Sequence, residues 1–284
     1  MNRIYKTFLE KILAFLPRLI KYHSRKNLLY ILANNFVDIL YKNLKNDKID
    51  IYPYNYNGKL HLPIFSLGNL DSHCCIQLPE MILHSYYFKY RNKYKVAVDM
   101  GSNIGIDAIL MAKYGMETYC YEPDKELYEK IIHHKEINNL KNLHANNYGI
   151  SNVEETVKFI KVKGNENANH VLGSRESYGE TETIQVNVKT FDSIVVKPDL
   201  MKINIEGHEK FVIPTIPLDV FYNCDTFIEV HDDKCRKIIW DYLCNKINIF
   251  SQKNNWKLAK NIEDLPTTNK EGYIFVSRKQ VMWD

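Results

Sequence analysis

The chain has 284 residues, of which 45% are hydrophobic and 25% charged, and this composition is typical of a soluble globular protein with one large domain. Residues 1–26 contain seven Lys and Arg and one acid, which gives this segment a net charge of +6. The rest of the chain has a net charge of −2, and the whole chain has +4. Because the chain after residue 26, called the body below, has no excess of positive charge, an extended nucleic-acid-binding surface on it is not expected. No apolar stretch reaches the roughly 18 residues of a membrane span, and no cysteine spacing fits a zinc site. We therefore expect a cytoplasmic protein with reduced thiols.

An amphipathic pattern begins the chain. In residues 3–21, apolar and basic side chains occupy opposite halves of a helical wheel, and Pro17 is expected to kink or end that helix. Such a helix either packs on the domain or a second subunit, or makes peripheral contact with an anionic membrane surface. A second apolar stripe follows in residues 28–44. We predict that residues 1–46 form an amphipathic helical extension.

Residues 47–92 form a predicted covering segment. Asn57-Gly58 is a hairpin turn signal between two short runs. Pro79 is placed at the first turn of a helix that extends to Tyr90. We expect this segment to lie beside the ligand cleft of the next domain and to cover the substrate.

A strand, a glycine turn and a helix are predicted in succession from residue 95 to residue 114. The turn has the spacing Gly-x-x-x-Gly and lacks the middle glycine of the dinucleotide fingerprint, which argues against an NAD(P)-linked oxidoreductase. An acid before the first glycine suits a cationic or hydroxyl-bearing ligand. The residues expected to bind this ligand are Asp99, Gly101, Ser102, Asn103 and Gly105.

Two further strands are predicted to add ligand contacts. The strand at 116–121 ends at Glu122, about 20 residues after the glycine turn, where nucleotide-binding α/β folds accept ribose hydroxyls. The strand at 142–148 ends at Tyr148, which could stack on an adenine or be a half-buried residue at the end of the strand. Both residues are candidates for binding a nucleoside.

An interruption follows in residues 152–190. Residues 153–162 and 183–188 alternate as strands do. The segment 164–182 between them is rich in Gly, Asn, Ser and Glu, which is typical of a long loop that acts as a lid or of a disordered insertion.

Polar residues follow the next two predicted strands, at 199–205 and 225–231. Ligands bind at the carboxyl ends of strands in open parallel sheets, so these side chains should converge on the glycine turn. A helix over 233–246 and an antiparallel pair of strands near 247–251 and 272–277 complete the predicted sheet. The converging residues are Asn204, Glu206, His208, Glu209, Glu229 and His231.

Five blocks of sequence together resemble the FkbM family of S-adenosylmethionine (SAM) dependent methyltransferases, and the resemblance covers about residues 94–277. The blocks are Val-Asp-Met-Gly-Ser-Asn-Ile-Gly (98–105), Tyr-Glu-Pro-Asp (121–124), Lys-Thr-Phe-Asp (189–192), Met-Lys-Ile-Asn-Ile-Glu-Gly-His-Glu (201–209) and Ile-Glu-Val-His (228–231).

The resemblance implies an α/β fold, namely a Rossmann-like class I methyltransferase sheet, mostly parallel with an antiparallel C-terminal strand. It implies a SAM-binding domain over residues 93–284, with SAM as the cofactor. The implied reaction is O-methyl transfer to a glycan or a small metabolite. The family usually has Asp where this chain has Asn204, which removes any function of that residue that depends on its charge.

The candidate catalytic residues come from the polar ends of the strands. A hydroxyl is a weak nucleophile, so we expect His231 or Glu206 to act as general base, with Glu209 and Glu229 orienting the acceptor or the base. His208 could join Glu206, Glu209 and His231 around a divalent cation, but no diagnostic spacing supports this, and no metal is assigned.

Two other functions are compatible with the sequence. One is a nucleic-acid methyltransferase recruited through the basic N-terminal tail, although no nucleic-acid partner is expected for the body. The other is a non-catalytic protein of the same fold that associates with membranes through its N-terminal helices. They predict, respectively, RNA binding that depends on the tail, and liposome binding without turnover.

Overall fold

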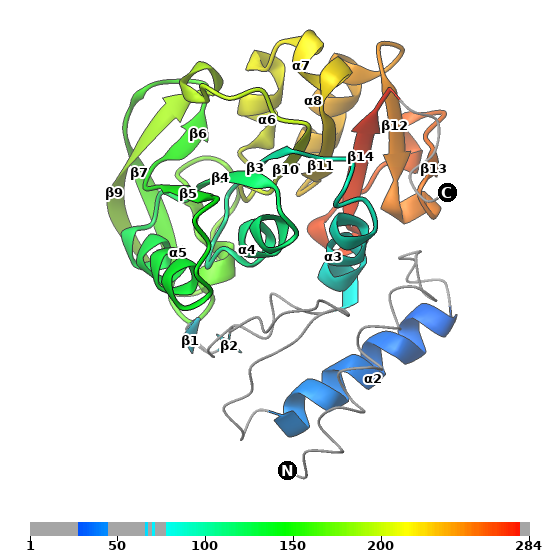
Figure 1. Ribbon diagram of the computed structural model, residues 1–284. Coiled ribbons are helices and arrows are strands. Elements are labelled where there is room, and N and C mark those ends of the chain that lie inside the picture. The colour runs from blue at the N-terminus through cyan, green and yellow to red at the C-terminus, as the bar shows by residue number, and fades with distance from the viewer. Residues whose placement is uncertain (1–27, 45–65, 68–69, 72–77, 279–284) are drawn as a thin grey trace.

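The computed structural model describes residues 28–44, 66–67, 70–71 and 78–278 (Figure 1). The amphipathic pattern of residues 3–21 and the turn at Asn57-Gly58 lie outside the described residues. The helix predicted over 28–44 is confirmed as α2 (Leu28–Leu44). None of the described helices is long and apolar enough to cross a membrane.

An eight-stranded sheet forms the centre of the molecule, in the order β13-β12-β14-β11-β10-β3-β4-β5. The five strands from β11 to β5 are parallel, whereas β14 runs antiparallel between β11 and β12. The predicted α/β class, with a mostly parallel sheet and an antiparallel C-terminal strand, is therefore confirmed. The strands are β3 (Val96–Met100), β4 (Glu117–Tyr121), β5 (Leu143–Asn146), β10 (Leu200–Ile203), β11 (Asp225–Glu229), β12 (Asn248–Ser251), β13 (Lys257–Leu258) and β14 (Tyr273–Ser277).

Helices cover both faces of this sheet (Figure 1). Because strand side chains alternate between faces, Ala97 and Phe227 enter one core, and their neighbours Val98 and Ile228 enter the other. The first core includes side chains of α3 (Leu78–Lys89), α4 (Ile106–Lys113) and α5 (Lys125–Ile137), and the second includes those of α6 (Glu209–Val212), α7 (Leu218–Asn223) and α8 (Asp233–Leu243).

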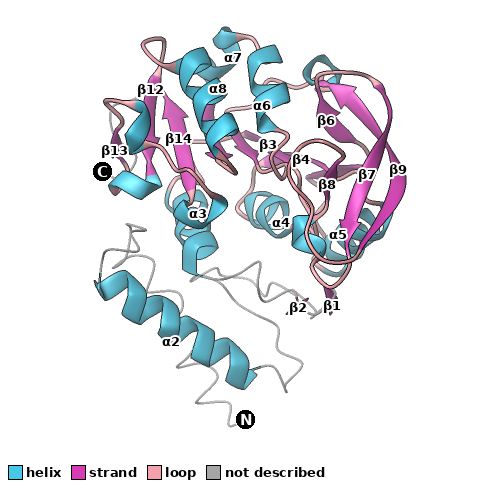
Figure 2. Cartoon of the chain, turned by 180° about the vertical axis from the view of Figure 1, so that it is seen from behind, coloured by secondary structure: helices cyan, strands magenta, loops and turns pink. Residues whose placement is uncertain are grey.

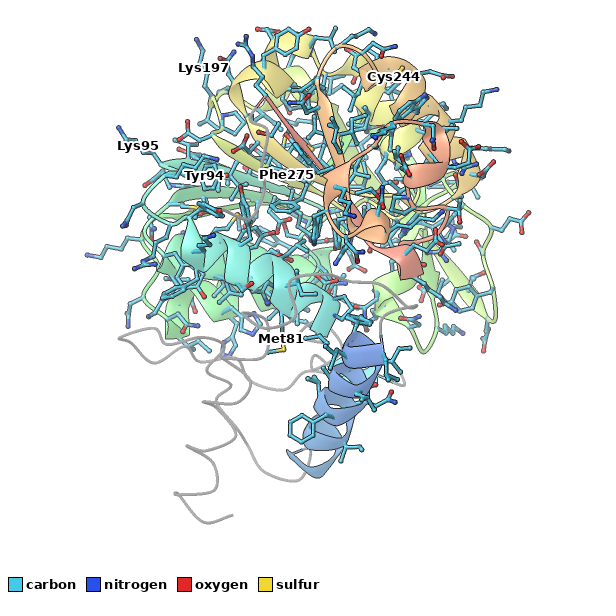
Figure 3. All side chains as sticks on the ribbon, turned by 90° about the vertical axis from the view of Figure 1, so that its right-hand side faces the viewer. Met81, Tyr94, Lys95, Lys197, Cys244 and Phe275 are labelled. Atoms are coloured by element: carbon cyan, nitrogen blue, oxygen red, sulfur yellow. The ribbon has the colours of Figure 1, made fainter. Side chains whose placement is uncertain are left out.

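Aromatic packing fixes α3 against the sheet. The ring centroid of Tyr86 lies 5.0 Å from that of Phe227 and 5.4 Å from that of Phe275. Figure 3 shows Phe275 and Tyr94 above the cyan helix α3. This packing holds α3 and its Glu80 in place at the edge of the cavity described below.

The interruption between β5 and β10 forms a second sheet of four strands, in the order β6-β9-β7-β8 (Figure 2). The two predicted strands are confirmed as β7 (Glu155–Val162) and β9 (Thr181–Thr190). The segment expected to be one long loop instead contains a 3₁₀ turn and a short strand. These elements were not predicted, because elements of two or three residues give no periodic signal. The other elements are β6 (Gly149–Ser151), η2 (Glu166–Ala168) and β8 (His170–Val171).

The remaining described elements are short. Two strands pair with each other ahead of α3, and 3₁₀ turns connect the later strands and helices. They are β1 (Ser66–Leu67), β2 (Leu70–Asp71), η3 (Phe191–Ser193), η4 (Ile213–Thr215), η5 (Gln252–Asn254), η6 (Ile262–Asp264) and η7 (Asn269–Glu271).

Candidate functional site

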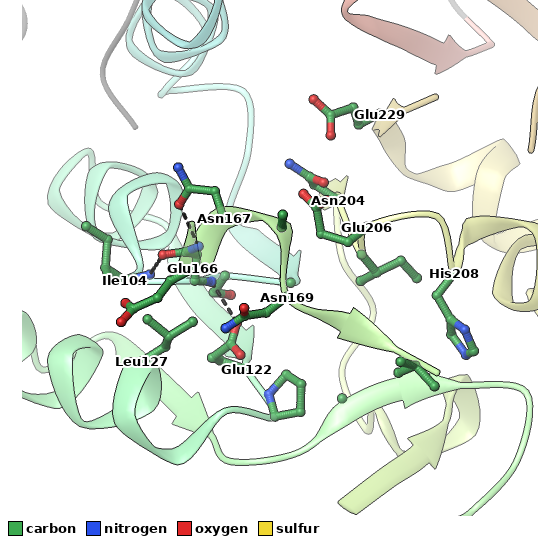
Figure 4. Close-up of a pocket in the computed structure, with 18 of the residues that line it drawn as sticks. Ile104, Glu122, Leu127, Glu166, Asn167, Asn169, Asn204, Glu206, His208 and Glu229 are labelled. Carbon is green, nitrogen blue, oxygen red and sulfur yellow. Dashed lines mark hydrogen bonds between the residues drawn. The ribbon is translucent and has the colours of Figure 1, made fainter. Parts of the chain in front are cut away.

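A cavity of about 290 Å³ lies at the carboxyl ends of the central parallel strands (Figure 4). Its volume is close to the lower limit for small-molecule sites. Asp99, Gly105, Tyr148, Glu209 and His231 are not among its lining residues. The predicted residues that line it are Gly101, Ser102, Asn103, Glu122, Asn204, Glu206, His208 and Glu229.

The glycine turn packs directly against the loop that follows β10. Gly101 has φ +77°, and a Cβ there would lie 1.8 Å from the backbone oxygen of Asn204. Gly105 has φ +83°, and a Cβ there would lie 3.0 Å from Cγ1 of Ile131 in α5. Both positions therefore require glycine, one to shape the cavity and the other to bring α4 close to α5.

Glu122 links β4 to the glycine turn. Its Oε2 accepts a hydrogen bond from the backbone N–H of Asn103 at 2.8 Å, and its Oε1 accepts one from the N–H of Asp124 at 2.9 Å. Burial raises the pKa of Glu122 to about 8, although both N–H groups oppose the rise. Each oxygen retains a lone pair, so the carboxylate can still accept hydrogen bonds from ligand hydroxyls.

Asp99 lies beneath the cavity, fully buried. The Nζ of Lys202 is 3.6 Å from its Oδ1 and 3.1 Å from Oδ2 of Asp107. Burial raises the pKa of Asp99 to about 6 against the attraction of Lys202. Lys202, which lines the cavity, is not among the residues predicted from the sequence, although a lysine inside an apolar strand signals a buried ion pair.

Tyr148 is not brought to the cavity. Its ring lies 5.3 Å from that of Tyr121, and the Nζ of Lys189 lies 4.8 Å from its centroid. The predicted stacking on adenine therefore finds no support in this position. An apolar wall near Glu122 is formed instead by other residues, namely Pro123, Leu127, Ile150, Phe159 and Val188.

The inserted sheet covers the cavity beside the glycine turn. The Nδ2 of Asn103 donates to Oδ1 of Asn167 at 3.1 Å, and Lys130 pairs with Glu166 at 3.0 Å. Figure 4 shows Glu166 and Asn167 near Ile104 and Glu122. The lid interpretation of this segment therefore fits its position.

On the other side of the cavity, Glu206 is held by two donors. Its Oε2 accepts from Nη1 of Arg175 at 2.5 Å and contacts Nε2 of His231 at 2.8 Å. The Nδ1 of His231 lies 3.4 Å from Oε2 of Glu229. Arg175 is not among the residues predicted from the sequence, because it belongs to the insertion and is part of no motif.

Burial controls the protonation of this group. It lowers the pKa of His231 to about 4 and raises that of Glu206 to about 8, the latter against the pull of Arg175. It also raises the pKa of Glu229 well above its usual range, and Glu206 adds to that shift. The low pKa of His231 makes it a weaker base than Glu206.

Glu209 and His208 are engaged elsewhere. The Oε1 of Glu209 accepts from the N–H of Ile205 at 2.8 Å, so this carboxylate stabilises its own turn. His208 contacts Ser151 Oγ at 2.9 Å and Ser174 Oγ at 2.8 Å. The suggested cation site that combined these two residues with Glu206 and His231 is therefore not assembled.

Comparison with known proteins identifies one sequence family. Residues 99–246 match the family model described as the methyltransferase FkbM domain. No curated protein matches the chain.

Two solved structures show weak similarity to this chain. An rRNA methylase from Streptococcus thermophilus is 11% identical over 70% of this chain and 93% of its own, with a TM-score of 0.36. A precorrin-6y C5,15-methyltransferase from Geobacter metallireducens GS-15 is 7% identical over 69% of this chain and 86% of its own, with a TM-score of 0.38.

Proposed function

This chain belongs to the FkbM methyltransferase family, since more than half of it matches the family's domain, and we propose that it transfers a methyl group from SAM to a hydroxyl of a glycan or small metabolite. One observation carries the proposal. The glycine turn with Glu122 and the pair Glu206 and Glu229 line the same cavity. A nucleoside-binding side and a proton-accepting side thus lie close enough to serve one reaction.

The first side of the cavity suits SAM. Glu122 has lone pairs left for ribose hydroxyls, and Gly101 lets a ligand approach the backbone. The Oδ1 of Asn204 is buried with no hydrogen-bond partner among the described residues, so it can accept a bond from the ligand. Carboxylates around the cavity favour a cation, and SAM supplies the methyl group as an electrophilic sulfonium carbon.

The second side suits a hydroxyl acceptor. Both contacts of Glu206 are made by Oε2, which leaves Oε1 to accept the hydroxyl proton. His231 and Arg175 position Glu206, and Glu229 orients the acceptor. With SAM bound, its methyl group would pass from sulfur to the acceptor oxygen, the demethylated thioether would leave, and Glu206 would take up the hydroxyl proton. Alignment and general-base catalysis each lower the barrier by several kcal/mol.

The parts of the chain contribute differently to this proposal. Residues 93–284 form the methyltransferase domain. We propose that the segment 47–92 covers the substrate, which Glu80 in its described part supports because it lines the cavity. Of the helical extension predicted over residues 1–46, the structure describes α2, and peripheral membrane contact through residues 3–21 is proposed from the sequence.

A methyl-transfer assay tests the assignment of Glu206. Labelled SAM is supplied with a panel of neutral sugars and hydroxylated metabolites, and SAM binding is measured separately by calorimetry. Glu206→Gln should keep SAM binding and lose roughly 10²–10⁴-fold in turnover. Glu176→Gln, which changes an exposed glutamate of the insertion between β5 and β10, should change neither. Unchanged turnover in Glu206→Gln would disprove the base, and absence of SAM binding in the wild type would disprove the function.

A further inference from the structure

His231 is buried between two carboxylates. Its side chain is 3% exposed. Its Nε2 lies 2.8 Å from Glu206 and its Nδ1 lies 3.4 Å from Glu229. The Nδ1 atom has no hydrogen-bond partner among the described residues. One ring nitrogen is thus well bonded, whereas the other is directed at an oxygen without a bond.

When Glu206 is ionised, the short contact to its Oε2 places the ring proton on Nε2, because a carboxylate only accepts. In the neutral ring, Nδ1 then presents a lone pair toward Glu229. When Glu229 is ionised, two acceptors thus face each other away from water, which is costly because neither is satisfied, and the raised pKa of Glu229 is consistent with that cost. A cation bound to both would remove that cost.

The charges around Glu229 lead to the same conclusion. Among the described residues, Lys202 forms its ion pairs with Asp99 and Asp107, and Arg175 forms its pair with Glu206. Glu229 has only His231 as an ion-pair partner in this part of the chain. A buried carboxylate at the cavity wall therefore lacks a strong cationic neighbour.

We propose that Glu229 and Nδ1 of His231 bind a divalent transition-metal ion. Ligand atoms of Glu206, Glu229 and His231 lie within 4.8 Å of one another, which leaves room for one ion. A metal-bound histidine commonly donates its other N–H to a carboxylate, and Glu206 occupies that position. Mixed imidazole and carboxylate ligands suit ions such as Mn²⁺ or Zn²⁺.

The site deepens the proposed methyl transfer, on which its role rests. Glu229 lines the cavity, so an acceptor oxygen can complete the coordination. A bound cation lowers the pKa of a hydroxyl, and Glu206 would receive its proton. The acceptor class is then one that offers a hydroxyl oxygen to the metal.

A second cluster provides the comparison. Glu80, His84 and Asp107 also lie within ligand distance of one another. There the Nζ of Lys202, 3.1 Å from Asp107, already supplies a positive charge. We therefore expect metal binding at His231 and not at His84.

The test is Mn²⁺ binding, followed by electron paramagnetic resonance, with a parallel calorimetric titration of Zn²⁺. The full chain is used as wild type, Glu229→Gln, His231→Gln, Glu206→Gln and the control His84→Gln. Melting temperatures and SAM binding report whether each variant is folded. The wild type and the control should bind one ion per chain. Glu206→Gln should bind it about 10–100-fold more weakly, and the other two variants more weakly still.

Two results would overturn the metal site. One is a wild type that binds SAM but neither ion. The other is a set of folded variants that bind the ions as tightly as the wild type does. Because SAM binding is measured in the same samples, loss of the proposed function is distinguished from loss of the metal. If Glu229→Gln fails to fold, Glu229→Asp, which shortens the ligand and keeps its charge, should still weaken Mn²⁺ binding.

Discussion

The carboxylate of Glu122 accepts the backbone N–H of Asn103 at 2.8 Å, so the end of β4 and the glycine turn form one unit. The other oxygen of the same carboxylate accepts the N–H of Asp124. One side chain thereby fixes the start of α5 and the wall of the cavity together. Changes at Glu122 should affect ligand binding and stability at once.

Glu122→Gln should weaken both SAM binding and folding. An amide has only one acceptor oxygen, so one of the two N–H groups loses its partner and the ribose hydroxyls lose an acceptor. We expect a loss of about 1.5–3 kcal/mol in SAM binding and of about 1–3 kcal/mol in stability. Calorimetry and urea denaturation measure the two. Glu117→Gln, at the exposed start of the same strand, should leave SAM binding unchanged, and equal losses in both variants would contradict this role.

SAM affinity should rise with pH between about pH 7 and 9. Burial, together with the charges of Asp124 and Asp99, raises the pKa of Glu122 to about 8. The ionised form binds the SAM cation and its hydroxyls better, so binding strengthens as the proton leaves. Without ligand, the stability of the folded protein should instead fall as the pH rises. Folding raises the pKa of this carboxyl, so its ionisation destabilises the folded state. Calorimetry across this range should show a rise that Glu122→Gln lacks, and a flat wild-type profile would contradict the prediction.

Gly101→Ala should disrupt the site, whereas Gly115→Ala should only strain the backbone. Both residues have positive φ, but a Cβ at Gly101 would lie 1.8 Å from a backbone oxygen and one at Gly115 would contact nothing within 4 Å. We expect a loss of about 1 kcal/mol in the free energy of unfolding for Gly115→Ala and of about 3 kcal/mol or more for Gly101→Ala. Denaturation curves and SAM titrations provide the comparison. Similar losses would show that the turn can move away from Asn204.

Lys202→Met should destabilise the protein most at alkaline pH. The change removes the cation from two buried carboxylates, Asp99 and Asp107, at a cost of about 3–5 kcal/mol when both are ionised. Lys202 holds the pKa of Asp107 below its usual range, even though burial alone would raise it. Without Lys202 both carboxyls can take up protons as pH falls, so the loss should shrink toward pH 5. Denaturation at alkaline pH and near pH 5 measures the loss of stability at each, with a substitution of the exposed Lys95, Lys95→Met, as control.

Much of the fold follows from local sequence signals. The succession of strand, glycine turn and helix from 95 to 114 and the alternation in 183–188 predict elements that the structure contains. The boundaries of η2 and β8 do not follow, because they depend on contacts such as Lys130 with Glu166 across the insertion. On α2, Leu32 and Phe36 are exposed, whereas their neighbours Ala33 and Val37 are buried. This pattern likewise depends on how that helix packs.

The site is less predictable than the fold. The position of Glu122 follows from its spacing to the glycine turn, since consecutive parallel strands end at one edge of the sheet. Arg175 could not be predicted, because it reaches Glu206 from a distant insertion. Tyr148 and Glu209 carry suitable chemistry, but their neighbours Tyr121 and Ile205 engage them away from the cavity.

The place of β14 in the sheet has a consequence during synthesis. This strand, Tyr273–Ser277, pairs with β11 and β12 on its two sides, so the sheet is interrupted until residues 273–277 have left the ribosome. A nascent or truncated chain that ends before Tyr273 exposes the backbone edge of β11 and the apolar side chains that β14 covers. Such edges pair readily with other chains, and incomplete products of this gene should therefore depend on chaperones to stay soluble.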